Sequence, residues 1–167
     1  GKLQALLDAL PDVLLEVDDQ GRYLQVHSGH SGNLAAPADK MLGKTLYQVL
    51  PPENAKIAYA ALAQAQQHGF SRGHTMCIDT PAGQRWFELS VTRQAAPPAG
   101  QRQRFVVISR NITERLHQEA SMRKLSQAVS QSPLPLVITD MKANIEFVNE
   151  AFVRSCEYSE AELIGQN

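Results

Sequence analysis

The side chains best suited to metal or covalent chemistry in this chain are two histidines and two cysteines. His27 and His30 stand three positions apart in a segment of Gly and Ser, and such a pair could supply half of a metal or haem site. No HExxH motif occurs, and no Cys or carboxylate is placed as an evident third ligand. Cys77 and Cys156 fit no zinc-binding spacing. We therefore expect no metal site, polar loop histidines and two reduced thiols.

Other signatures of chemistry are missing from the sequence. It contains no nucleophile elbow, no Gly-rich phosphate loop and no paired-carboxylate motif, so we expect no catalytic activity. Its 16 basic and 17 acidic residues leave a net charge of −1, which disfavours a nucleic-acid partner or a polybasic membrane-surface protein. Apolar runs are short and no secretory signal is visible, so the sequence predicts a cytoplasmic protein without membrane contact.

An internal repeat organises the chain. Pro11 matches Pro133, Leu14 matches Leu136, Asp18 matches Asp140, Val26 matches Val148 and Gly43 matches Gly165, each 122 positions further on and without a gap. The matches fall at equivalent positions in the two copies: the end of a helix, a strand, a turn, a second strand and the end of a helical segment. The sequence therefore predicts two copies of one structural unit.

Each copy carries the pattern of a β-hairpin. Residues 13–17 and 23–26 form two short apolar runs around a tight polar turn, and residues 136–139 and 145–148 repeat this pattern. Strands that are joined by so few residues must pair antiparallel.

Only the first copy continues beyond its short helices. Apolar residues at helical spacing predict a helix over 53–68, and further apolar or alternating runs predict strands over 74–79, 85–92 and 104–110. These elements predict an α+β fold in which a five-stranded antiparallel sheet carries its helices on one face. We accordingly divide the chain into a domain (1–110), a helical linker (111–132) and a partial second unit (133–167).

Four local motifs resemble those of one family. The sequence GQRWFE at 83–88 resembles its fourth-strand motif, and RNITER at 110–115 resembles the RDITER signature that opens its exit helix, with Asn in place of the usual Asp. In the second copy, FVNEAF at 147–152 and SEAELIG at 159–165 resemble two further motifs. The chain therefore resembles the PAS domain family, the PAS/PAC sensory boxes of bacterial signalling proteins, with one complete copy and the truncated start of another.

The resemblance implies a regulatory function. PAS domains bind a small molecule or dimerise, and they control output domains such as histidine kinases or diguanylate cyclases. We therefore expect a sensory signal-transduction module that forms a homodimer and acts on a downstream output domain. Two alternatives stay open: a ligand-free interaction or dimerisation module, and an enzyme on a similar scaffold.

The resemblance leaves the cofactor of such a module unknown. Haem is disfavoured, because a haem-binding PAS domain would carry its ligand within the helix over 53–68, whose interior holds Ala, Gln, Tyr and Leu. A flavin photosensor of the LOV type is disfavoured too, because its reactive Cys would precede that helix, whereas Cys77 follows it.

A pocket is expected where the sheet faces its helices, lined by aliphatic side chains from several elements. The candidate lining residues are Val26, Leu34, Ile57, Leu62, Met76, Phe87 and Leu89, and His27 and His30 are polar candidates in the adjoining loop. The alternative for each apolar candidate is an ordinary core position.

The linker has the pattern of a capped helix. Asn111, followed three residues later by Glu114, suits a helix N-terminus. The apolar positions that follow are candidates for a dimer contact: Ile112, Leu116, Met122, Leu125 and Val129. Their spacing holds no strict heptad, so a solvated connector and a signalling helix in a dimer both stay open.

Overall fold

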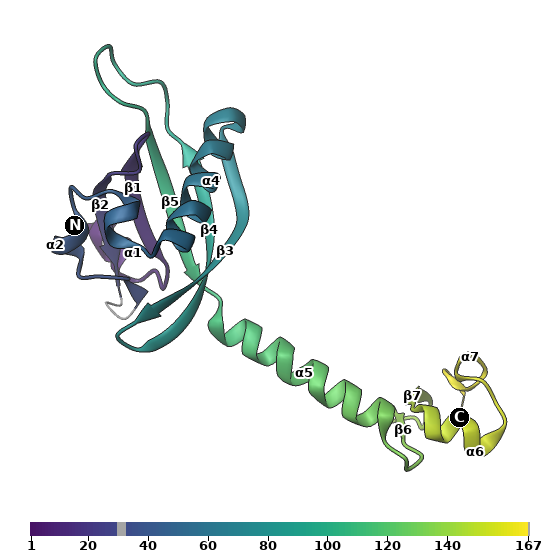
Figure 1. Ribbon diagram of the computed structural model, residues 1–167. Helices are drawn as coiled ribbons and strands as arrows, with labels where there is room; N and C mark the ends of the chain where they lie inside the picture. The colour runs from purple at the N-terminus through teal and green to yellow at the C-terminus, as the bar shows by residue number, and fades with distance from the viewer. Residues whose placement is uncertain (30–32, 167) are drawn as a thin grey trace. The chain divides into compact units, whose positions relative to one another are not determined.

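The computed structural model describes residues 1–29 and 33–166, which divide into two compact units, one up to Glu114 and one from Arg115 onward. The elements of the first unit are α1 (Lys2–Asp8), β1 (Val13–Asp18), β2 (Tyr23–Ser28), α2 (Ala38–Met41), α3 (Leu46–Val49), α4 (Pro52–His68), β3 (Phe70–Thr80), β4 (Gly83–Arg93) and β5 (Arg104–Asn111) (Figure 1). His30 lies outside the described residues, so the candidate role of its side chain is not addressed by the structure.

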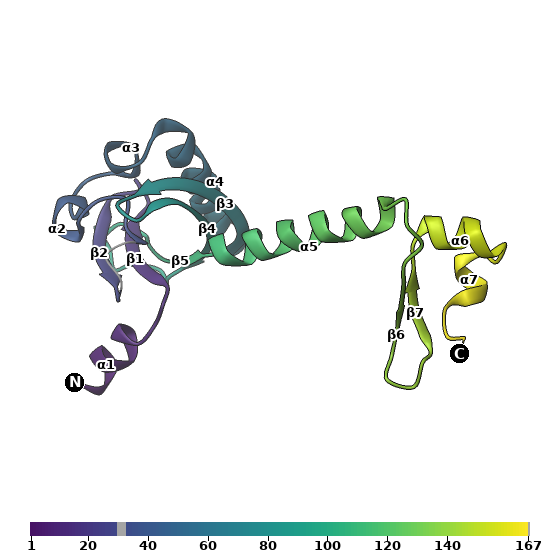
Figure 2. The same ribbon diagram turned by 90° about the horizontal axis from the view of Figure 1, so that it is seen from below.

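The five strands of the first unit form one sheet in the order β2-β1-β5-β4-β3, and all neighbours are antiparallel. The last strand, β5, therefore lies in the middle. Its Ser109 stands opposite Val13 of β1 on one side and Leu89 of β4 on the other. Helices α3 and α4 lie over one face of this sheet (Figure 2). The predicted α+β fold with a five-stranded antiparallel sheet is confirmed.

The core forms between this face of the sheet and the helices. Along β4, Phe87, Leu89 and Val91 are buried while the residues between them are partly exposed, which is the alternation of a sheet with one covered face. Four of the buried side chains of α4 are alanines, so the helix packs close to the sheet. Helix α4 begins with Pro52 in its first turn and ends at Gly69, whose φ of 87° lies in the left-handed region.

The turn between β1 and β2 is fixed by one carboxylate and one tyrosine. Oδ1 of Asp18 accepts hydrogen bonds from the backbone amides of Gln20 and Arg22, both at 2.9 Å. The Tyr59 hydroxyl on α4 donates to the carbonyl oxygen of Gln20 at 2.7 Å. Gly21 has a φ of 76°, and a Cβ at this position would lie 2.6 Å from the Tyr59 hydroxyl oxygen. Glycine at this position avoids both the strain of a left-handed backbone and a close contact with the Tyr59 ring.

The second unit is a hairpin followed by two short helices. Helix α5 (Thr113–Gln131) crosses the boundary between the units, and β6 (Val137–Thr139), β7 (Ile145–Val148), α6 (Glu150–Cys156) and α7 (Glu160–Leu163) follow. Strands β6 and β7 pair antiparallel, with Val137 opposite Val148. At the start of the predicted linker (111–132), Asn111 is the last residue of β5 and Ile112 is buried in the first unit.

Candidate functional site

A cavity lies inside the first unit, between the sheet and helices α2, α3 and α4. Its volume is about 50 Å³, where a single water on the same measure needs roughly 10–15 Å³. Side chains from all five strands, from the three helices and from residues 33–35 line it. The described lining is aliphatic or thioether apart from Tyr23, Asn33 and Ser109, and it contains no charged side chain. A compact molecule of several heavy atoms fits this space.

Four of the seven predicted lining residues do face the cavity, namely Leu34, Leu62, Met76 and Leu89. Ile57 does not, because it lies one position before Ala58, about 100° around α4 from the face that Ala58 and Leu62 present. Phe87 is 1% exposed and belongs to the packed core instead.

Val26 and His27 line a separate hollow on the surface, together with Ser28, residues 34–38 and Pro81. Leu34 and Ala35 line both this hollow and the cavity, so they form the wall between the two spaces.

Nε2 of His27 lies 3.4 Å from Oδ1 of Asp8 but makes no hydrogen bond with a described residue. Within residues 1–29 and 33–166, no group of three His, Cys, Asp or Glu side chains is arranged to hold a metal ion.

Sequence reasoning missed several lining residues, among them Tyr23, Asn33 and Met41. The repeat offered a signal for Met41, since this position matches Leu163 and lies two residues before the repeated glycine. Alternation along the second strand could have placed Tyr23 on the inner face. Asn33 follows a short loop, and no pattern in the sequence marks it.

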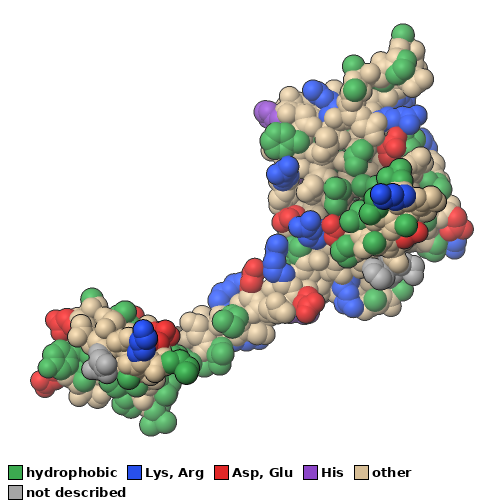
Figure 3. Space-filling view, turned by 180° about the vertical axis from the view of Figure 1, so that it is seen from behind, with side chains coloured by type: hydrophobic (Ala, Val, Ile, Leu, Met, Phe, Trp, Pro, Cys, Tyr) green, Lys and Arg blue, Asp and Glu red, His purple; other side chains and the backbone are tan. Residues whose placement is uncertain are grey.

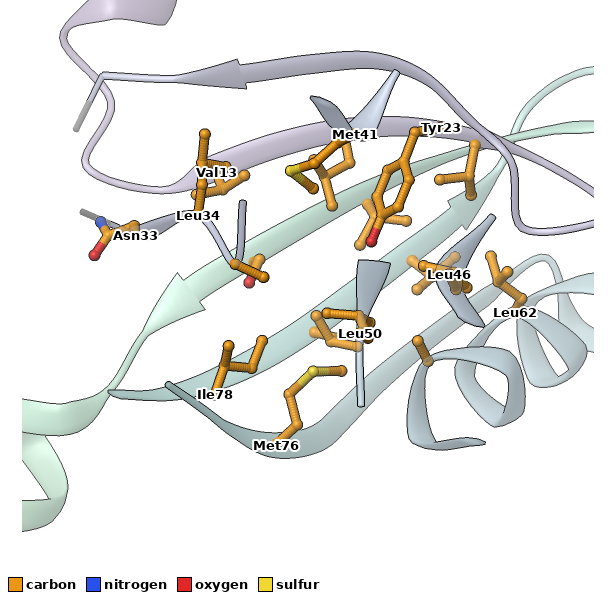
Figure 4. Close-up of a pocket in the computed structure, with 18 residues that line it drawn as sticks. Val13, Tyr23, Asn33, Leu34, Met41, Leu46, Leu50, Leu62, Met76 and Ile78 are labelled. Carbon is orange, nitrogen blue, oxygen red and sulfur yellow. The ribbon is translucent and has the colours of Figure 1, made fainter. Parts of the chain in front are cut away.

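Tyr23 is the most deeply buried of the polar lining residues, with 2% of its surface exposed. Figure 4 shows its ring reaching away from β2, with the hydroxyl oxygen directed into the pocket. Burial raises the pKa of this phenol above its ordinary value of 10.0, and the nearby Tyr59 raises the pKa further. The hydroxyl is therefore protonated throughout the physiological range and can both donate and accept a hydrogen bond.

Asn33 connects the cavity to the start of helix α5. Its Oδ1 accepts a hydrogen bond from Nδ2 of Asn111 at 3.1 Å, and Oδ1 of Asn111 accepts from the backbone amide of Thr113 at 3.0 Å. Oγ1 of Thr113 in turn accepts from the backbone amide of Trp86 at 2.8 Å. Ile112 completes the junction by donating its amide to the Trp86 carbonyl at 2.8 Å. A continuous set of hydrogen bonds therefore joins the cavity wall, the first turn of α5 and strand β4.

Charges outside the cavity are mixed. Basic and acidic side chains are interspersed on the face of the molecule in Figure 3. Two arginines of β5 form ion pairs: Arg104 with Glu16 of β1 at 2.9 Å, and Arg110 with Asp12, the residue before β1, at 3.5 Å. The predicted linker contacts differ in exposure: Met122 and Leu125 are more than 60% exposed, whereas Leu116 and Val129 are half-buried and Ile112 is buried.

In the part of the chain that the structure describes, every helix is too short or too polar to cross a membrane.

Comparison with known proteins gives two family matches. Residues 7–117 match a family model described as the PAS fold, and residues 123–166 match one described as a PAS domain. A comparison with curated proteins finds no match.

Several solved structures share the fold of the first unit. The PAS domain of a protein from Colwellia psychrerythraea matches with a TM-score of 0.54 and 18% identity, over 68% of this chain and 97% of that one. A PAS domain from a two-component sensor histidine kinase matches with a TM-score of 0.50 and 14% identity, over 66% of this chain and 93% of the other. An RNA-binding light-oxygen-voltage receptor matches with a TM-score of 0.57 and 14% identity, over 76% of this chain and 37% of its own.

Proposed function

This chain belongs to the PAS family, and on that premise we propose that it is a sensory module controlling a downstream output domain. A small molecule occupies the cavity of the first unit, and its presence is passed to helix α5. The module has no catalytic activity of its own, and its output domain is of the histidine-kinase or diguanylate-cyclase type. One structural neighbour, a PAS domain from a two-component sensor histidine kinase, is part of a protein with the first kind of output.

The observation that carries this proposal is the hydrogen-bonded connection from Asn33 through Asn111 to Thr113. Asn33 lines the cavity, so a ligand that displaces its side chain changes the partner available to Asn111. Oδ1 of Asn111 also accepts from the amide of Thr113, the first residue of α5, and one such hydrogen bond typically contributes about 1 kcal/mol. A free-energy change of about 1 kcal/mol shifts the equilibrium between the formed and the open first turn of α5 about five-fold. Coupling between two sites in a protein typically begins at this size.

We place the module in the cytoplasm. Cys77 and Cys156 are both free thiols, as is usual for proteins of a reducing compartment.

The test is native mass spectrometry of the purified chain, compared with its denatured mass. A mass excess that is lost on denaturation supports the proposal and identifies the ligand by mass. Leu62→Trp fills the cavity and should abolish the excess, because Leu62 lines it. Ile57→Trp is the matched control on the same helix, outside the lining, and should retain the excess. Retention in both variants would contradict this site.

Dimerisation is a second candidate function, with or without a ligand. Helix α1 favours it, since Leu3 and Leu6 are 72% and 60% exposed on this helix. A second copy of the chain would cover them. Light scattering coupled to gel filtration should report a dimer, and Leu3→Gln with Leu6→Gln should shift it toward the monomer; a wild-type monomer at high concentration would contradict this candidate.

A further inference from the structure

The side chains that line the cavity indicate which chemical class of ligand it can bind. Its described lining contains no Lys, Arg, His, Asp or Glu. An ionised ligand would therefore lose its hydration without gaining a counter-charge, which is strongly unfavourable. The described lining therefore favours an uncharged ligand over one that carries a carboxylate, phosphate or ammonium group.

The polar atoms of the lining are not equivalent. The carboxamide of Asn33 is already engaged, since its Nδ2 donates to the carbonyl oxygen of Pro11 at 3.4 Å and its Oδ1 accepts from Asn111. The hydroxyls of Tyr23 and Ser109 make no hydrogen bond with any described residue. Both residues line the cavity, so a ligand within it can supply a hydrogen-bond partner to either hydroxyl.

The apolar part of the lining is adaptable. Met41 and Met76 both project their thioethers into the pocket in Figure 4, and both are 3% exposed. Unbranched thioether side chains change rotamer at low cost and make favourable contacts with aromatic rings. The cavity can therefore fit the outline of a small aliphatic or aromatic body.

We infer that the ligand is a compact, uncharged molecule with an apolar body and at least one hydroxyl or carbonyl group, which hydrogen-bonds to the Tyr23 hydroxyl. This inference rests on the proposed function, because it concerns the same cavity. Tyr23 on β2 lines the cavity together with Leu46 of α3 and Leu62 of α4, so a hydrogen bond to its hydroxyl would orient the ligand between sheet and helices.

The experiment compares three molecules of similar size as probes: phenol, fluorobenzene and benzoate. Each is titrated into the full chain and followed by chemical-shift changes of backbone amides in residues that line the cavity. We expect phenol to bind about five-fold more tightly than fluorobenzene, the difference of one net hydrogen bond, and benzoate not to bind. Tyr23→Phe should remove the difference between phenol and fluorobenzene, while Tyr47→Phe, which alters an exposed tyrosine outside the lining, should preserve it.

The outcomes separate this inference from the function on which it rests. Equal affinity of the wild-type chain for phenol and fluorobenzene would overturn the role of Tyr23 and leave ligand binding in the cavity intact. Binding of benzoate at the cavity would overturn the assignment of an uncharged ligand. If none of the three probes perturbs the lining residues, both the inference and the proposed ligand site fail. The wild-type comparison needs no variant, so it holds even if Tyr23→Phe does not fold.

Discussion

The two units carry different side chains at one equivalent position, His27 in the first and Asn149 in the second, 122 residues apart. Asn149 is 2% exposed. Its Oδ1 accepts from the amides of Leu136 and Phe152 at 2.9 and 3.0 Å, and its Nδ2 donates to the carbonyls of Val129 and Leu134 at 3.0 and 2.9 Å. One carboxamide therefore holds together the end of α5, the start of the hairpin and the first turn of α6.

His27 does none of this in the first unit. Its side chain is 22% exposed, and its Nε2 faces the carboxylate of Asp8 without a hydrogen bond to a described residue. Val26, His27 and Ser28 line a hollow beside the cavity wall instead. The equivalent position therefore carries a side chain with four strong hydrogen bonds where Asn stands, and one whose Nε2 has no hydrogen bond to a described residue where His stands.

The turns of the two hairpins have the same hydrogen bonds from backbone amides to an aspartate, so the contrast between His27 and Asn149 does not extend to the turns. Oδ1 of Asp140 accepts from the amides of Lys142 and Asn144 at 2.8 and 2.9 Å, as Asp18 does from the amides two and four residues further on. The second unit adds one bond, from Nδ2 of Asn144 to Oδ2 of Asp140 at 3.0 Å.

The largest effect is expected for Asn149→Ala. The change leaves buried amide and carbonyl groups without partners, so we expect a loss of about 3 kcal/mol in the free energy of opening of the hairpin and α6. Hydrogen exchange of the amides in β6, β7 and α6 measures this loss directly. Protection equal to that of the wild-type chain would show that the carboxamide does not hold the junction.

A smaller effect is expected for Asn111→Ala, which removes the side-chain hydrogen bonds to Asn33 and to the Thr113 amide at the end of the first unit. Loss of the hydrogen bond to the Thr113 amide should destabilise the first turn of α5 by about 1 kcal/mol, measured by exchange of the α5 amides. Asn111→Ser keeps a side-chain oxygen near that amide but is too short to reach Asn33, so it should retain most of the stability and lose the response of α5 to ligand. Ser121→Ala, at an exposed position within α5, is the control. A full response in the Ser variant would contradict the connection through Asn33.

His27→Ala should have less effect than either change. Asp8, the residue that faces Nε2, is 60% exposed, and Nε2 makes no hydrogen bond with a described residue, so we expect a change below about 0.5 kcal/mol in the unfolding free energy of the first unit. Urea denaturation followed by fluorescence measures it. A loss above about 1 kcal/mol would mean that the His27 side chain stabilises the segments around β2, as Asn149 does in the second unit.

The smallest effect is expected from acid on the turn of the second hairpin. The side-chain hydrogen bond from Asn144, with the backbone amides of Asn144 and Lys142, lowers the pKa of Asp140 below its ordinary value of 3.8. A lowered pKa means that the ionised carboxylate stabilises the turn above pH 3.8 and that this contribution is lost as the pH falls through the lowered pKa. NMR titration of the Asp140 carboxyl group measures the shift, and Asn144→Ala should return the pKa toward 3.8. An unchanged pKa in that variant would assign the shift to the backbone amides alone.

Much of this molecule could be predicted from local signals. The helix end at Gly69, both hairpins and the alternation along β4 follow from residue type and spacing, and the structure confirms them. The hydrogen-bonded connection from the cavity wall to α5 could not be predicted in this way. Asn33 matters because Asn111, 78 positions away, donates to it, and such a pairing is determined by the packing of the whole sheet. The contrast between His27 and Asn149 was visible as a mismatch in the repeat, but its consequence depends on which carbonyl groups surround each side chain.

Trp86 gives the junction between sheet and exit helix a property of its own. It is the only tryptophan in the chain, it is 39% exposed, and its backbone amide and carbonyl bond to Thr113 and Ile112. Excitation at the red edge of the protein absorption band therefore selects a single indole, located where the first turn of α5 is attached. Its emission colour and quenching by solutes report on that attachment in real time, without any label. The protein therefore has an intrinsic fluorescent reporter where the first turn of α5 is attached to β4.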